Sequence, residues 1–271
     1  MDFRFGIGVM AVKSAARFTE KVRRFADQGY DVLHVPDHIG APAPFPVMMA
    51  AADAANIRVG TFVLNAAFYK PALLARDAVA LDQLSEGRLE LGLGTGYVRE
   101  EFEAAEMPYP SAGERVDHLR HITTYLKRVA PSIPILIAGN GDRVLRIAAQ
   151  HADIIGFTGG GLPTAENPDP MAERVEFVRA AAGDRIGDLE FNLAITAVPT
   201  DDSGVPDLSL TRAYFTDATD EQLLAMPTVL QGSPAEIADT LRQQRERYGT
   251  TYYTVQDYHG DYFAEVIKEL R

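Results

Sequence analysis

The chain has 271 residues, of which 46% are hydrophobic, and a formal net charge of −12. No linker, repeat or low-complexity segment divides it, so we expect residues 1–271 to form one domain. The negative charge, with no basic stripe, disfavours nucleic acids and anionic membranes as partners, because these are bound through clustered Lys and Arg. The absence of cysteine excludes disulfides and thiolate metal sites.

The first residues, MDFRFGIGV, place the charged Asp2 and Arg4 among short apolar stretches. This segment lacks the long apolar core of a signal peptide, and no apolar run in the chain reaches membrane-spanning length. We therefore expect a cytoplasmic protein.

Apolar runs of strand length alternate with segments of helical periodicity. The predicted strands are Phe3–Val9, Val32–Pro36, Ile57–Leu64, Leu89–Gly94, Pro134–Ala138, Ile154–Phe157, Leu189–Val198 and Thr251–Val255. The predicted helices are Ala15–Gln28, Pro46–Ala55, Pro71–Leu84, Gly113–Val129, Asp142–His151, Met171–Ala181, Pro234–Tyr248 and Tyr262–Leu270. Three glycines that follow helices are expected to form left-handed caps: Gly29, Gly87 and Gly249.

Eight strands alternating with helices predict an α/β protein with a closed (β/α)8 TIM barrel. The alternative, an open doubly wound sheet, usually has fewer strands and a glycine-rich turn after its first strand, which this chain lacks. Ligands of such a barrel bind at the carboxyl ends of its strands. The long irregular stretch 199–233, between the last two strands, is expected to cover this face.

Asp37 and His38 directly follow the second predicted strand. A carboxylate and an imidazole at this end are suited to proton transfer or to polar contact with a ligand. The alternative is that Asp37 caps a turn and His38 is only a polar residue of the rim. His34, inside the strand, is expected to be a buried histidine with satisfied hydrogen bonds.

Residues 57–96 read as strand, helix and strand, and the two strands deliver Asn65, Thr95 and Gly96 to the same rim. The run from Gly92 to Gly96 does not fit the dinucleotide motif G-x-G-x-x-G, because residue 97 is a tyrosine. We interpret the first two glycines, 92 and 94, as sites of tight barrel packing. Thr95 and Gly96 are better ligand candidates.

Gly139, Asn140 and Gly141 join the fifth predicted strand to a helix that begins at Asp142. The free N–H groups and the dipole of that helix end can bind a phosphate, although a simple strand-to-helix turn would give the same sequence. Gly159, in the glycine run after the sixth strand, is a less specific candidate of the same kind. No metal site is expected, because the six histidines are scattered.

The chain resembles the bacterial luciferase-like monooxygenase superfamily, and most of all its branch that uses the deazaflavin coenzyme F-420. The resemblance covers nearly the full length. It rests on VPDH at 35–38, GTFVLNAAFYKPALLARDAVALDQLSEGRLELGLGTGY at 60–97, PILIAGNGDRVLRIAAQHADIIGF at 134–157 and LQGSPAEIADTLRQQRERYGTTYYTV at 230–255. The second piece is the most specific in length and order.

The resemblance implies a TIM barrel with a flavin-like ring at its mouth, resting on a cis peptide between Phe62 and Val63. It also implies ring contacts from Asp37 and His38, with proton transfer by His38. Further cofactor contacts are implied for the tail and phosphate sites: Thr95, Gly96, Ala138, Gly139, Asn140 and Gly141. The expected reaction is hydride transfer between F-420 and a small organic substrate, in a homodimer.

One position departs from the pattern of this branch. Its sugar-phosphate dehydrogenases have a catalytic glutamate directly after the matching Thr-Gly pair, where this chain has Tyr97, and Glu100 and Glu101 lie a helical turn further on. Lys70 is the main basic residue expected near the mouth. Two alternatives stay open: an FMN-dependent monooxygenase of the same family, and a flavin-binding member without catalytic activity.

Overall fold

The computed structural model describes residues 2–271, and all its named strands belong to one parallel sheet. The strands follow one another around the sheet in the order β3-β2-β1-β9-β8-β7-β6-β5-β4. Because β3 also pairs with β5, the sheet closes on itself, which confirms the predicted TIM barrel. The strands are β1 (Arg4–Gly8), β2 (Val32–Val35), β3 (Arg58–Thr61), β4 (Leu64–Asn65), β5 (Leu89–Gly94), β6 (Ile135–Ala138), β7 (Ile154–Phe157), β8 (Glu190–Ala194) and β9 (Thr250–Gln256).

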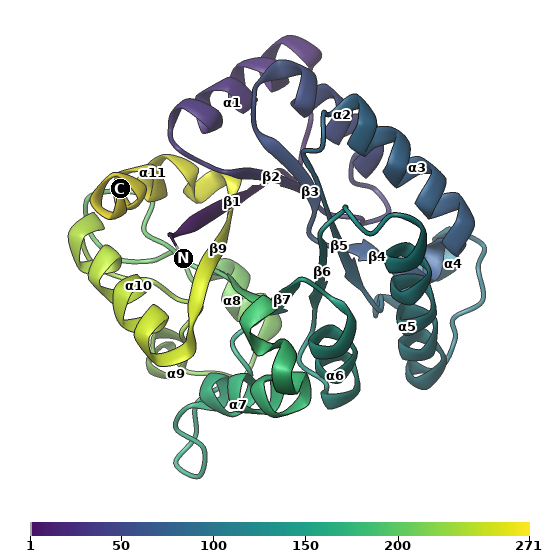
Figure 1. Ribbon diagram of the computed structural model, residues 1–271. Helices are drawn as coiled ribbons and strands as arrows, with labels where there is room; N and C mark the ends of the chain where they lie inside the picture. Colours follow the sequence, from purple (N-terminus) through teal and green to yellow (C-terminus); the bar gives the residue numbers. More distant parts are fainter. Residues whose placement is uncertain (1) are drawn as a thin grey trace.

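The helices form an outer ring around the strands (Figure 1). The main helices of this ring are α1 (Ala15–Asp27), α2 (Pro44–Ala54), α3 (Pro71–Leu84), α5 (Ala112–Val129), α6 (Asp142–His151), α7 (Pro170–Ala182), α10 (Pro234–Tyr248) and α11 (Gly260–Leu270). Shorter elements lie in the connections: α4 (Arg99–Ala104), α8 (Ser209–Tyr214), α9 (Asp220–Leu224), η1 (Ala66–Phe68), η2 (Gly183–Asp188) and η3 (Asp257–His259). The three predicted glycine caps, at 29, 87 and 249, all have positive φ.

Two sequence predictions about the region after β8 were wrong. The seventh predicted strand, Leu189–Val198, was expected to stay extended to Val198, but β8 ends at Ala194 because the N–H of Thr196 turns away to the carbonyl of Thr228. Residues 199–233 were expected to be irregular, yet they contain α8 and α9. Helices of five or six residues are too short to show an apolar period, and the same applies to α4.

The third barrel strand is interrupted between β3 and β4, where the peptide bond from Phe62 to Val63 is cis, as expected. The Thr61 hydroxyl spans the interruption by donating to the carbonyl of Gly92 at 2.8 Å and accepting from its N–H at 2.9 Å. A Cβ on Gly92 would lie 2.0 Å from the Thr61 carbonyl oxygen, and one on Gly94 would lie 2.7 Å from the Val63 side chain. The packing interpretation of these two glycines is therefore confirmed.

A polar network crosses the barrel interior from β2 to β9 and β5. His34 is 1% exposed, and its Nε2 lies 2.8 Å from the Tyr252 hydroxyl, which donates to Glu90 at 2.8 Å. Arg4 pairs with Glu90 at 2.7 Å and also with Glu190. The expectation that His34 is a buried, hydrogen-bonded histidine is confirmed.

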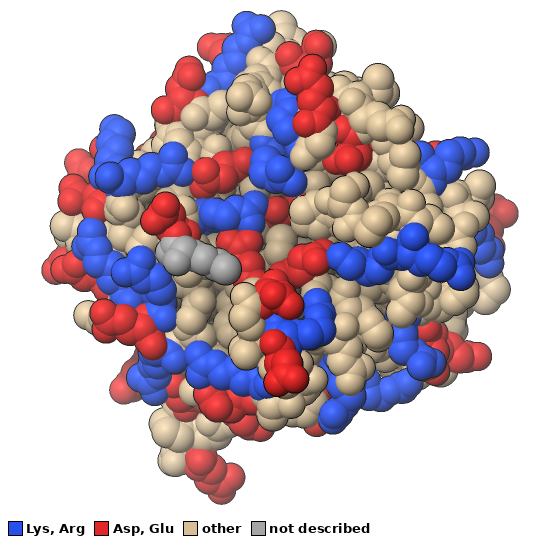
Figure 2. All heavy atoms as spheres, in the orientation of Figure 1, with Lys and Arg blue, Asp and Glu red and all other residues tan. Residues whose placement is uncertain are grey.

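The surface in view in Figure 2 mixes Lys and Arg with Asp and Glu, and has no continuous area of one charge. Among residues 2–271, no helix combines the length and the apolar character that crossing a membrane requires.

Candidate active site

Asp37 and His38 lie at the carboxyl end of β2, and His38 meets a carboxylate from the connection after β5, two positions away around the barrel. Its Nδ1 is 2.6 Å from Oε1 of Glu101, which α4 carries after β5. The His38 side chain is 44% exposed, whereas that of Glu101 is only 14% exposed. An ionised carboxylate accepts a hydrogen bond, so this pair places the proton of a neutral imidazole on Nδ1 and leaves Nε2 free to face a ligand.

Asp37 occupies an environment that perturbs its titration. Burial raises the pKa of the Asp37 carboxyl, and the negative charge of Glu101 raises it further. Hydrogen bonds from the N–H of Asn65 and from the Tyr69 hydroxyl lower it. The N–H of Asn65 donates to the carboxylate at 3.1 Å. A desolvated carboxyl that faces a second carboxyl and a histidine is typical of a functional site.

Phe62, Val63 and Ala138 come together inside the barrel, although they belong to different strand ends. All three pack on the same interior cluster, which includes Leu136 and Tyr252. The ring of Phe62 stacks on that of His34, with centroids 5.0 Å apart and planes 3° apart. Aromatic and aliphatic side chains thus make a half-buried floor at the carboxyl end of the strands.

Asn65 and Gly96 are in close contact beside this floor. A Cβ on Gly96 would lie 2.1 Å from Oδ1 of Asn65, and φ of Gly96 is +69°, so the position requires glycine for packing alone. Asn65 is 6% exposed, and its Nδ2 has no hydrogen-bond partner. Oε1 of Gln256, at the end of β9, is likewise buried without a partner. Such groups fit a ligand that carries polar atoms.

The connection after β6 leaves the amino end of α6 open. Gly141 is the N-cap and no side chain caps the helix. Gly141 is exposed, and a Cβ added there would meet nothing within 4 Å. Arg143 lies in the first turn, and Arg174 of α7 pairs with Asp142 at 2.6 Å. Free N–H groups with basic side chains nearby fit a phosphate.

Packing against neighbouring side chains explains why residues 139 and 159 are glycines. A Cβ on Gly139 would lie 2.9 Å from the Val144 side chain. One on Gly159, whose φ is +89°, would lie 2.8 Å from the Thr228 side chain. The structure therefore accounts for both glycines without a ligand, and it leaves Asn140 and Gly141 exposed at the helix end.

The match to a family model decides the family: it covers residues 3–250 and is described as "Luciferase-like monooxygenase". The chain belongs to the luciferase-like monooxygenase family. An uncharacterised protein of Mycobacterium tuberculosis is 34% identical over 202 residues, which cover 57% of this chain and 68% of the relative. An F-420-dependent glucose-6-phosphate dehydrogenase of Intrasporangium calvum is 30% identical over 161 residues, 46% of this chain and 48% of the relative.

Solved structures of low sequence identity share the luciferase-like fold. An F-420-dependent tetrahydromethanopterin reductase of Methanopyrus kandleri has a TM-score of 0.78 at 15% identity, with full coverage of both chains. An F-420-dependent secondary alcohol dehydrogenase in complex with an F-420–acetone adduct has a TM-score of 0.77 at 16% identity, again with full coverage of both. A long-chain alkane monooxygenase has a TM-score of 0.75 at 12% identity and covers 100% of this chain and 90% of that one.

Three contacts of the candidate site in this luciferase-like protein were not predicted from the sequence. Glu101 was noted only as displaced from the expected glutamate position, although it is the carboxylate that reaches His38. Tyr69 was not singled out as a partner of Asp37, and Arg174 was not linked to the helix end at Asp142. No group of His, Asp and Glu able to hold a metal ion occurs among residues 2–271.

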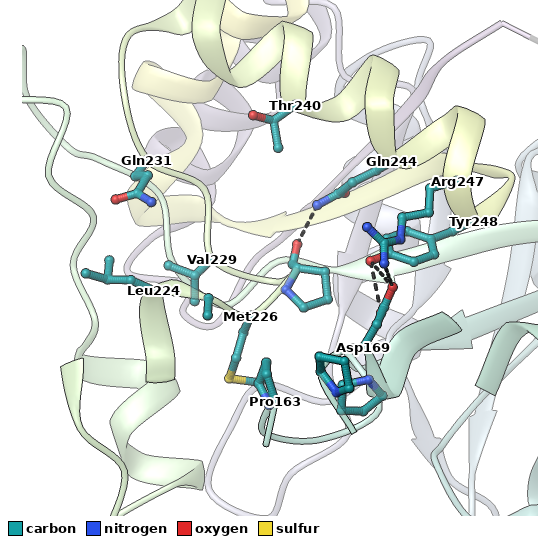
Figure 3. Close-up of a pocket in the computed structure, with 14 residues that line it drawn as sticks. Pro163, Asp169, Leu224, Met226, Val229, Gln231, Thr240, Gln244, Arg247 and Tyr248 are labelled. Carbon is teal, nitrogen blue, oxygen red and sulfur yellow. Dashed lines mark hydrogen bonds and ion pairs between the residues drawn. The ribbon is translucent and has the colours of Figure 1, made fainter. Parts of the chain in front are cut away.

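The luciferase-like barrel also has a cavity of about 300 Å³ between the connection after β7, α9 and α10 (Figure 3). Arg247 and Tyr248 reach Asp169 at one end of it, and Gln244 donates to the carbonyl of Pro227 at 2.9 Å (Figure 3). None of the predicted site residues lines this cavity.

Proposed function

We propose that this protein is an oxidoreductase that transfers a hydride between the deazaflavin coenzyme F-420 and a small organic substrate. The observation that carries the proposal is the contact between His38 and Glu101, beside the desolvated Asp37, at the carboxyl end of the barrel. The relatives named as F-420-dependent glucose-6-phosphate dehydrogenases favour this cofactor.

The residues present fit such a cofactor. The half-buried surfaces of Phe62, Val63 and Ala138 suit a flat ring, and the unpartnered Nδ2 of Asn65 suits one of its polar edges. The open amino end of α6, from Gly141 onward, suits its phosphate. When bound, F-420 supplies the hydride chemistry, and the protein contributes orientation and proton transfer.

His38 acts as the acid or base of the reaction. When the substrate is oxidised, its carbon loses a hydride and its hydroxyl proton passes to the free Nε2 of His38, which forms an imidazolium; reduction reverses both transfers, with the imidazolium as the proton donor. The carboxylate of Glu101 lies 2.6 Å from Nδ1 of His38. This contact fixes the orientation of the imidazole ring and keeps its Nε2 directed to the mouth of the barrel. A positioned proton donor of this kind contributes about 10²–10⁴-fold in rate.

Parallel titrations with F-420 and FMN test the proposal. We expect saturable binding of F-420 that is at least ten-fold tighter than binding of FMN, a difference of about 1.4 kcal/mol. Tight binding of FMN alone would favour the monooxygenase alternative. Binding of either cofactor without turnover of any acceptor would favour a non-catalytic flavin-binding protein.

A further inference from the structure

The cavity between the connection after β7, α9 and α10 is separate from the candidate active site. Fourteen residues line it, and none of the residues predicted to bind the cofactor is among them. Its volume of about 300 Å³ is at the small end of the range of ligand pockets. Thr240, Gln244 and Tyr248 follow one another at four-residue spacing, so one face of α10 forms a wall (Figure 3). The cavity thus has room for a small molecule and lies among the outer helices.

Proline forms much of the remaining wall. Of the fourteen lining residues, four are prolines: Pro163, Pro168, Pro170 and Pro227. The proline ring fixes the backbone φ angle, so this wall is formed before a ligand enters, and little chain entropy is lost on binding. Proline rings also pack closely on flat aromatic surfaces, the contact by which aromatic-lined grooves bind proline-rich peptides. The wall therefore suits a flat aromatic ligand.

The charges of the cavity cancel. Asp169 and Arg247, the two charged residues of the lining within residues 2–271, form an ion pair. The Asp169 carboxylate also accepts from the Tyr248 hydroxyl at 3.1 Å and from the N–H of Ala172 at 3.0 Å. Because both charges are already paired, a charged ligand would lose its hydration here without gaining an opposite charge. An uncharged ligand is therefore favoured.

One hydrogen-bond acceptor of the lining is left without a partner. Nε2 of Gln244 donates to the carbonyl of Pro227 at 2.9 Å (Figure 3), and since that carbonyl can only accept, the amide nitrogen and not the amide oxygen faces it. Gln244 is 8% exposed, and its Oε1 has no hydrogen-bond partner among the described residues. The Thr240 hydroxyl donates to the Glu236 carbonyl at 3.0 Å and so supplies no proton to Oε1. A donor on a ligand would satisfy this acceptor.

We propose that this cavity is a second binding site, which takes an uncharged, planar aromatic molecule with one N–H or O–H group. The aromatic faces pack on the proline wall, and the N–H or O–H group donates to Oε1 of Gln244. This site is independent of the proposed function, because it uses neither the cofactor contacts nor the pair of His38 and Glu101. A molecule bound here contacts the connections after both β7 and β8.

Indole is a probe of this class, because it is flat and uncharged and carries one N–H group. The chain contains no tryptophan, so indole fluorescence can be followed without an indole signal from the protein. We expect saturable binding of indole with a dissociation constant of about 1 mM or below. 1-Methylindole has the same ring but no N–H donor, and it should bind about 3–10-fold more weakly, as expected for the loss of one hydrogen bond. Equal affinity of the two probes, or no saturable binding of indole, would refute the proposal.

Filling the cavity tests where indole binds. Thr240→Phe places a large side chain in the cavity and removes only a hydroxyl that bonds its own helix, so indole binding should weaken at least about ten-fold. Thr124→Phe is the matched control, because the Thr124 hydroxyl bonds the carbonyl of Arg120 in its own helix α5, away from the cavity. It should leave indole binding unchanged. Unaltered binding in Thr240→Phe, or equal losses in both variants, would place indole elsewhere and overturn the proposal.

Gln244→Leu isolates the hydrogen bond. This variant loses Oε1, so indole and 1-methylindole should bind to it with equal affinity. A substitution that only disturbs packing would instead weaken both probes by the same factor and preserve their ratio, and a preserved ratio would contradict the role of Gln244. If Gln244→Leu does not fold, the comparison of the two probes on the wild type and the Thr240→Phe titration still decide.

The indole titration is repeated with saturating F-420 and should give the same dissociation constant. If F-420 displaces indole, the probe binds at the mouth of the barrel, and the second site is wrong while the proposed function stands. If F-420 itself does not bind, the proposed function is wrong, and the indole titrations on the unloaded protein still decide whether the second site exists.

Discussion

Nδ1 of His38 lies 2.6 Å from Oε1 of Glu101, although 63 positions separate them in the chain. The two residues reach each other because β2 and β5 end at the same opening, and α4 directs Glu101 inward while its neighbour Glu100 stays exposed. A proton donor held by a carboxylate is the arrangement from which we derive the first prediction.

We predict that His38→Ala reduces turnover about 10²–10⁴-fold and leaves F-420 affinity within about ten-fold of wild type, since a neutral hydrogen bond to a ligand contributes only about 1 kcal/mol. Glu101→Gln should also reduce turnover, because the amide keeps the size of the side chain but loses the charge. Glu100→Gln is the matched control and should change neither quantity. Turnover with an acceptor for reduced F-420 and cofactor titrations provide the measurements. Equal effects of Glu100→Gln and Glu101→Gln would refute the role of Glu101.

A second prediction concerns the interruption of the third strand. Thr61→Val removes the hydroxyl that bonds both backbone groups of Gly92, and both groups become unpaired in the interior. We expect a loss of about 1–3 kcal/mol in the free energy of unfolding, or roughly 2–4 °C in Tm for each kcal/mol. Thr124→Val, on the exposed face of α5, should cost much less. Thermal unfolding followed by circular dichroism measures both, and equal losses would contradict the bridging role of Thr61.

The polar network in the barrel predicts a pH dependence of stability. Burial opposes ionisation of Glu90, but the His34 ring, whose Nε2 lies 3.7 Å from the carboxylate, and the charge of Arg4 outweigh it and lower the pKa of Glu90 to about 2, from an ordinary 4.5. A lowered folded-state pKa stabilises the protein above the unfolded value, and this contribution is lost as the pH falls toward the folded value. Glu90→Gln should thus be less stable than wild type near neutral pH, and the difference should shrink below about pH 4.5. Denaturant titrations at several pH values measure it; a difference that grows on acidification would contradict the assignment.

A substitution at the open amino end of α6 tests whether the cofactor phosphate binds there. Gly141→Val places a side chain where nothing lies within 4 Å, so the fold should be retained while the approach of a phosphate is blocked. We expect at least ten-fold weaker F-420 binding. Gly187→Val is the control, because a Cβ there also meets nothing within 4 Å. Full F-420 affinity in Gly141→Val would place the phosphate elsewhere. Gly139→Val is a poorer test, since its side chain would clash with Val144.

The homodimer stays a prediction. In the segment 42–55, which includes α2, the only charged residue is Asp53, and Pro46 and Ala50 of α2 are exposed. We expect sedimentation at micromolar concentration to give a dimer, and Ala50→Glu to shift it toward a monomer by placing a charge in the contact. A wild-type protein that sediments only as a monomer would show that this apolar face has no partner copy.

The sequence alone determined the alternation of elements and many of their limits. The bounds of α3, α6 and α10 agree with the prediction to the residue, because Pro71 and Pro234 begin two of these helices and apolar periodicity extends through all three. The resemblance to the luciferase-like family located the interruption at Phe62–Val63. Local signals of this kind are carried by residues that are neighbours in the chain, so one sequence suffices to read them.

The tertiary structure decided which rim residues meet. Glu101 lies on a helix too short to show periodicity, and its distance from His38 depends on how two strand ends converge. The course of the long connection after β8 was decided in the same way, since its helices α8 and α9 were not predicted from the sequence. Contacts between segments that follow different strands are set by the closure of the barrel and by the packing of its connections, and no spacing along the chain encodes them.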